Sequence, residues 1–96
     1  MANTDYHESF ELLKENTIEM HRALTSLIEE LEAIDWYNQR VDVCKDKELE
    51  AILIHNRDEE KEHAAMLLEW IRRQDPQFES ELKDYLYSDK KFQVKK

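Results

Sequence analysis

Mostly apolar residues recur in the first part of the chain at alternating intervals of three and four positions. They are Phe10, Leu13, Thr17, Met20, Leu24, Leu27, Leu31 and Ile34. Such spacing brings side chains to one face only on an α-helix, which completes a turn every ~3.6 residues. The pattern predicts one long helix from about Tyr6 to Asn38. Asp5 is the expected N-cap, with Glu8 three residues further on.

The periodicity stops between Arg40 and Lys47, which indicates a short connection to a second helix. Asp46 is well placed to cap that helix, since its carboxylate can accept hydrogen bonds from the first backbone N–H groups. The second helix is predicted from about Lys47 to Gln74. It should stop before Pro76, because proline disfavours the helical conformation of the preceding residue.

Proline is also tolerated in the first turn of a helix, so a short third helix is predicted over residues 76–87. The lysine-rich residues 88–96 that follow are expected to form a flexible tail. The sequence therefore predicts a single all-α domain over residues 1–96. Its architecture is an antiparallel two-helix hairpin with a short C-terminal helix.

Composition restricts the function. The 96 residues contain no glycine and one proline, which disfavours phosphate-binding loops, tight hairpins and dinucleotide-binding folds. A net charge of −9 disfavours nucleic acids and anionic membranes as partners, and no segment is apolar enough to span a membrane. The single Cys44 cannot form an intrachain disulfide, which fits a cytoplasmic protein.

Polar residues occupy part of the apolar face expected on the second helix. The residues spaced by three and four are Leu53, Asn56, Glu60, His63, Leu67 and Trp70. Glu60 and His63 form a Glu-x-x-His pair on one helical face, where a carboxylate and an imidazole can bind the same ion. Glu30 offers a matching carboxylate on the first helix, beside its apolar face.

These three side chains are half of a known ligand set. A di-iron four-helix bundle takes one glutamate from each of two helices and a Glu-x-x-His from each of the other two. Two copies of the hairpin would therefore complete both a four-helix bundle and its metal site. A ligand set of carboxylates and imidazoles favours iron or manganese.

The predicted helix bounds leave a mismatch in register. With a first helix ending at Asn38 and a second beginning at Lys47, Glu30 lies 8 residues from the turn and Glu60 lies 13. At helical rise this is an offset of about 7 Å. A first helix that extends into the connection would remove it, as would a later start of the second helix or ligands donated across the dimer.

Two segments resemble the encapsulated ferritins, ferritin-like ferroxidases that work inside encapsulin shells. They are EELEAIDWY at residues 29–37 and HNRDEEKEHAAM at residues 55–66, and the likeness covers roughly residues 8–87. The resemblance implies that Glu30, Glu60 and His63 bind two iron ions at a ferroxidase centre between two protomers. Calcium, manganese or zinc could take the place of iron there or at a secondary site.

The resemblance has further implications. Glu29 and Glu32, with Trp36 close by, would form a secondary acidic site on the route of iron into the centre, and Tyr37 would lie in the outer shell of the centre. The homodimers would assemble into a ring, a decamer, within an encapsulin nanocompartment of the cytoplasm. Family members carry a C-terminal targeting peptide that these 96 residues lack, so we expect either a longer natural chain or a member that is not encapsulated.

Two other functions compete with the ferroxidase. A metal-independent dimeric helical adaptor with an acidic binding face would also explain the charge and the long helices. It predicts that chelators leave the oligomer unchanged and that His63→Ala has no effect. An oxygen-binding hemerythrin-like domain would need more histidines at bundle positions than the four in this chain.

Overall fold

The computed structural model of the protein describes residues 6–95. Within them the chain forms a short 3-10 helix, η1 (Phe10–Leu12), and three α-helices, with no strand. The α-helices are α1 (Glu15–Val43), α2 (Lys47–Gln74) and α3 (Pro76–Tyr85). The prediction of an all-helical chain is confirmed over this part of the sequence. None of these helices is both long and apolar enough to cross a bilayer.

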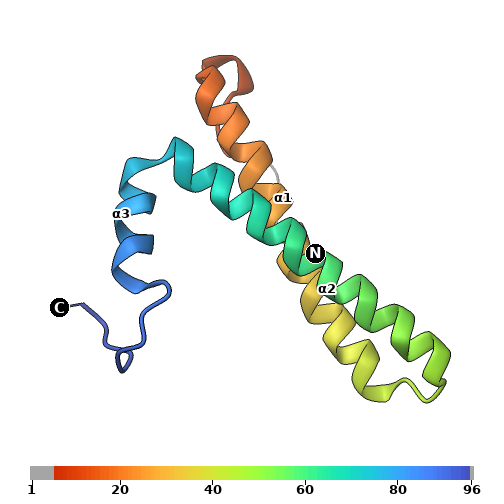
Figure 1. Ribbon diagram of the computed structural model, residues 1–96. Coiled ribbons are helices and arrows are strands. Elements are labelled where there is room, and N and C mark those ends of the chain that lie inside the picture. Colours follow the sequence, from red (N-terminus) through yellow and green to blue (C-terminus); the bar gives the residue numbers. More distant parts are fainter. Residues whose placement is uncertain (1–5, 96) are drawn as a thin grey trace.

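The helices α1 and α2 form an antiparallel hairpin, and α3 bends away from the far end of α2 (Figure 1). Residues 44–46 make the turn of the hairpin. Asp46 is the N-cap of α2, since its Oδ1 atom accepts hydrogen bonds from the backbone N–H groups of Glu48 and Leu49 at 2.9 and 3.0 Å. This cap sets the start of α2 where the sequence predicts it.

The first helix begins later than predicted, at Glu15 instead of about Tyr6. The expected cap, Asp5, lies outside the described residues. The ring of Tyr6 stacks on His21 at a centroid distance of 4.2 Å and meets the edge of Phe10 at 5.3 Å. These aromatic contacts fold the N-terminal segment back along α1, so tertiary packing overrides the helical spacing that Phe10 and Leu13 continue.

The first helix also ends later than predicted, at Val43 instead of about Asn38. The extension changes the register of the hairpin. Glu30 lies 13 residues before Val43, and Glu60 lies 13 residues after Lys47. The two carboxylates are therefore level across the hairpin, and the offset of the predicted bounds disappears.

The C-terminal helix is capped by Asp75, whose Oδ1 atom accepts a hydrogen bond from the backbone N–H of Phe78 at 3.0 Å. It ends at Tyr85, two residues earlier than expected, and Tyr87 adopts a positive φ of 57° that reverses the chain. The residues that follow have no regular structure but lie against α3. Phe92 stacks on Tyr85, and Lys95 pairs with carboxylates of α3. Residues 88–95 thus contact α3, and the flexibility expected of this tail stays a prediction.

The buried core of a single chain is small. Its buried apolar residues are Ala23, Ala64 and Ile71. The accessible surface is 8177 Å², against about 5,900 Å² expected for a compact monomer of this mass. The radius of gyration is 17.0 Å, against about 12.5 Å for a compact chain of this length. One chain alone therefore leaves far more surface exposed than a compact domain does.

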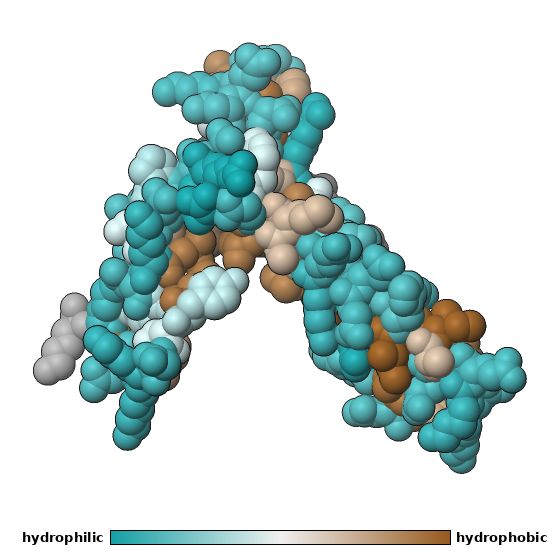
Figure 2. All heavy atoms as spheres, in the orientation of Figure 1, coloured by the Kyte–Doolittle hydropathy of each residue, from teal (hydrophilic) through white to brown (hydrophobic). Residues whose placement is uncertain are grey.

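Part of that surface is apolar. Figure 2 shows hydrophobic side chains on the inner side of the bend between α2 and α3 and near the turn of the hairpin. Along α1, Leu24, Ile28 and Leu31 form an exposed row at intervals of four and three. Along α2 the exposed apolar residues Met66 and Trp70 lie one turn apart. Each long helix thus has two apolar faces, one against its neighbour and one uncovered, as helices of a four-helix bundle do.

Candidate metal centre

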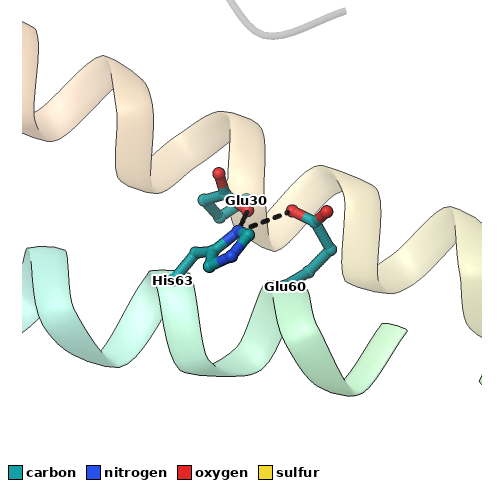
Figure 3. Close-up of side chains that lie close together, drawn as sticks. All are labelled: Glu30, Glu60 and His63. Carbon is teal, nitrogen blue, oxygen red and sulfur yellow. Dashed lines mark ion pairs between the residues drawn. The ribbon is translucent and has the colours of Figure 1, made fainter. Parts of the chain in front are cut away.

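Glu30, Glu60 and His63 meet in the middle of the hairpin. Glu30 comes from α1, and Glu60 and His63 come from successive turns of α2 (Figure 3). The His63 Nδ1 atom lies 3.4 Å from Glu30 Oε2 and 3.7 Å from Glu60 Oε2. One donor atom of each residue lies within 4.8 Å of the others, close enough for one ion to contact all three. The structure thus brings together the three side chains that the sequence predicts.

The cluster is partly sheltered. The side chains of Glu30 and Glu60 are each 23% exposed, and that of His63 is 41% exposed. His63 lies one turn before Leu67 and three residues before Met66, so it borders the uncovered apolar face of α2. The cluster is covered on the side of the hairpin and open on the side of that face.

The charges in the cluster are unbalanced. The pKa of Glu30 is raised above its usual value, chiefly by the neighbouring Glu60 carboxyl, because two close carboxyls share a proton more readily than both ionise. Burial raises it further, and His63 opposes both effects. Glu30 Oε2 is buried without a hydrogen-bond partner among the described residues. A divalent cation would supply the missing partner and neutralise the carboxylates, so the residues fit a metal ion.

A second group of close donor atoms adjoins the first and shares His63 with it. Its other members are Glu59 and Glu62, and one donor atom of each of the three side chains lies within 4.8 Å of the others. Glu59 also pairs with His55, whose Nε2 atom lies 3.0 Å from Glu59 Oε1. Sequence reasoning missed Glu59 as a neighbour of His63. The interval of four residues between them was the signal that could have identified it.

The residues of the expected secondary site lie on α1, the helix that also carries Glu30. Glu29 is exposed, Glu32 is half-buried and Trp36 is 41% exposed. Their intervals of three and four place them on one face of the helix. Within residues 6–95 neither carboxylate belongs to a group of three candidate metal ligands. Tyr37 is half-buried, and the Arg40 guanidinium carbon lies over its ring, 5.2 Å from the ring centroid.

Comparisons with known proteins give related chains. The encapsulated ferritin-like protein of Rhodospirillum rubrum is 60% identical over 88 residues, which are 92% of this chain and 63% of that protein. A ferritin-like protein of Thermotoga maritima is 53% identical over 88% of this chain and 75% of its own length. The encapsulin nanocompartment cargo protein EncC of Myxococcus xanthus is 38% identical over 80% of this chain and 60% of its own length. The chain thus spans less than two thirds of the first of these relatives.

A solved structure has the same fold. It is the crystal structure of a protein from Nitrosomonas europaea, which is 69% identical, with a TM-score of 0.87 over 90% of this chain and 94% of that one. The EncFtn-like family matches residues 5–89, nearly the whole chain. The segments on which the resemblance rests, residues 29–37 and 55–66, lie inside this match and contain Glu30, Glu60 and His63. The chain therefore belongs to the EncFtn-like family, the family of the encapsulated ferritins.

Proposed function

We propose that the protein is a ferroxidase, which oxidises Fe(II) to Fe(III) with dioxygen at a di-iron centre shared by two protomers. The observation that carries the proposal is the cluster of Glu30, Glu60 and His63, with its partnerless carboxylate oxygen and its open side. One chain supplies two carboxylates and one imidazole. A second copy facing the first would complete four carboxylates and two imidazoles, the ligand set of a di-iron bundle.

The uncovered apolar faces support the pairing of two copies. Leu24, Ile28 and Leu31 on α1 and Met66 and Trp70 on α2 are exposed in the single chain, and His63 lies beside Met66. Burying these side chains against their equivalents would favour the dimer, since each Å² of apolar surface removed from water contributes about 25 cal/mol before the entropic costs of association are subtracted. The same contact would close the open side of the cluster, so assembly and metal binding are coupled in this proposal.

The chemistry follows from the ligands. Two Fe(II) ions carry four positive charges, which the four carboxylates of the paired sites neutralise, and carboxylate ligands favour the ferric product. Each iron gives one electron to a dioxygen molecule, which takes up two protons and leaves as hydrogen peroxide. Iron is thus the substrate, and the chain's own residues hold two ions close together and sheltered from bulk water.

The relatives indicate where the activity would take place. The proteins of R. rubrum and M. xanthus are described as encapsulated and as the cargo of an encapsulin nanocompartment. We extend this setting to the present chain, as iron-handling cargo of an encapsulin shell assembled as a ring of dimers. The same proposal keeps Glu29, Glu32 and Trp36 as a secondary site on the route of iron, and Tyr37 as a residue of the outer shell.

An oxidation assay tests the proposal. Fe(II) is added under anaerobic conditions, air is admitted, and ferric absorbance is followed in the wild type and in Glu30→Ala, Glu60→Ala and His63→Ala. We expect each variant to lower the initial rate by at least about tenfold, since losing even an outer-shell partner weakens metal sites by 10–100-fold. Glu11→Ala is the matched control, because Glu11 is exposed in η1.

Two outcomes would count against the ferroxidase. Equal rates in the wild type and the three cluster variants would contradict it directly. An oligomer that is unchanged by a chelator and by His63→Ala, together with background rates of iron oxidation, would favour the metal-independent adaptor instead. Circular dichroism of each variant separates the loss of a ligand from the loss of the fold.

A further inference from the structure

The His63 ring presents two nitrogen atoms to two different surroundings. Its Nδ1 atom faces Glu30 and Glu60, at 3.4 and 3.7 Å (Figure 3). The Nε2 atom stands on the other side of the Cε1 atom, so it is directed away from these carboxylates. If Nδ1 is to give its lone pair to a metal ion, a neutral ring must carry its proton on Nε2. That N–H needs an acceptor, which in metal sites is commonly a carboxylate.

Two carboxylates lie near His63 besides those of the centre. Donor atoms of Glu59, Glu62 and His63 lie within 4.8 Å of one another. Glu59 precedes His63 by four residues and so lies on the same face of α2, whereas the adjacent Glu62 points about 100° away around the helix. Glu59 is also held in place by His55, at 3.0 Å from its Oε1 atom. Its remaining acceptor capacity is free to serve a second donor.

We propose that Glu59 is a positioning residue for the metal centre, which accepts the Nε2–H hydrogen bond of His63 and so presents Nδ1 to the metal. The two groups of donor atoms share only His63, so Glu59 belongs to no group with Glu30 or Glu60. Glu59 therefore acts through His63 and not as a metal ligand. His55 completes a row of His55, Glu59 and His63 at intervals of four residues along α2. The inference rests on the proposed function, since it requires that His63 bind a metal ion.

The experiment uses Zn²⁺ as a redox-inert probe of the full chain. Its affinity is measured by titration calorimetry in the wild type, Glu59→Leu, Glu59→Gln and the control Glu62→Leu. We expect Glu59→Leu to weaken zinc binding by about 10–100-fold, the usual effect of losing an outer-shell partner. Glu59→Gln should recover most of the affinity, because its amide oxygen still accepts a hydrogen bond. Glu62→Leu removes the same charge nearby and should bind zinc as the wild type does.

A second readout follows the ring itself. Nitrogen-15 shifts of His63 in the zinc-loaded protein should show a protonated Nε2 and a metal-bound Nδ1 in the wild type, and a mixture of ring states in Glu59→Leu. Unchanged affinity and an unchanged ring in Glu59→Leu would overturn the inference, and so would a zinc defect in Glu62→Leu alone. If His63→Ala bound zinc as tightly as the wild type, the proposed function would be overturned as well.

Discussion

At the scale of single residues, the candidate centre brings two carboxyl groups together. The Glu60 carboxyl raises the pKa of Glu30, and an oxygen of Glu30 is buried without a hydrogen bond among the described residues. The sequence predicts these two glutamates and His63. Glu60 and His63 are three residues apart, and polar residues are rare on the apolar face of a helix, so both signals can be recognised without a structure. The sequence does not single out the proximity of Glu59 to His63, since a glutamate on a helix surface has many possible neighbours.

The raised pKa of Glu30 gives a prediction for the metal-free protein. A carboxyl whose folded-state pKa is raised contributes stability below its unfolded pKa, and this contribution is lost as pH rises through the folded-state pKa. Glu30→Gln removes the ionising carboxyl. We therefore expect the variant to be more stable than the wild type at about pH 8 and to lose this advantage near about pH 4.

Urea unfolding of both proteins in the presence of a chelator measures the difference. Glu11→Gln serves as the control, because Glu11 is exposed and remote from the centre. If the advantage of Glu30→Gln were the same at both pH values, repulsion within the cluster would not be its cause. The same variant should lose metal affinity, since the amide brings no charge to the ion.

Ile71 carries a separate prediction about the core. Its side chain is 1% exposed, the lowest value in the described chain, and few other residues are buried. We expect Ile71→Ala to lower the free energy of unfolding by about 2–5 kcal/mol. Val43→Ala, at a residue that is 76% exposed, should change it by less than about 0.5 kcal/mol. Chemical denaturation checks both values, and equal effects would contradict this assignment of the core.

At the scale of elements, helix caps are predicted well from the sequence and helix lengths poorly. Asp46 caps α2 as expected, and Asp75 caps α3 in the same way, because a carboxylate before a helix acts through local geometry alone. The start of α1 depends instead on Tyr6 packing against His21, a contact across many residues. The end of α1 at Val43 shows that loss of apolar spacing does not end a helix, since an exposed last turn needs no apolar face.

The bend between α2 and α3 is held by Arg72. Its guanidinium contacts Glu69 on α2 and Glu79 on α3, each at 2.6 Å, and it helps to hold the pKa of Glu69 at about 2. Arg73 contacts only Glu69. We expect Arg72→Gln to speed amide hydrogen exchange in α3 severalfold, and Arg73→Gln to leave it nearly unchanged. Equal exchange in both variants would show that the bend does not depend on the bridge.

At the scale of the whole molecule, the single chain leaves apolar surface exposed beside its candidate metal site. A surface of 8177 Å² and a radius of gyration of 17.0 Å both exceed the values of a compact monomer of this size, as the proposed pairing of two copies requires. The sequence predicts such a pairing from the incomplete ligand set. The sequence could not show which apolar residues stay exposed. Leu24, Leu27 and Leu31 belong to the same spacing of three and four residues, yet Leu27 is half-buried while Leu24 and Leu31 are exposed.

A substitution on the uncovered face tests the partner without touching a ligand. Leu31 is 53% exposed in the single chain and would be buried between two copies. We expect Leu31→Asp to convert dimers into monomers, and the loss of the paired site should weaken metal binding at the same time. Leu12→Asp is the matched control, since Leu12 is 82% exposed in η1 and away from that face. Light scattering gives the molar mass of each protein, and an intact Leu31→Asp dimer would argue against this interface.

Native mass spectrometry under anaerobic conditions tests the shared centre most directly, because it counts chains and metal ions in the same particle. With Fe(II) present, we expect two metal ions for every two chains, in dimers or in multiples of dimers, and none in single chains. Glu30→Ala, Glu60→Ala and His63→Ala should each abolish this loading. Single chains that bind iron as tightly as the assembled protein, or iron loading that survives all three substitutions, would contradict the account.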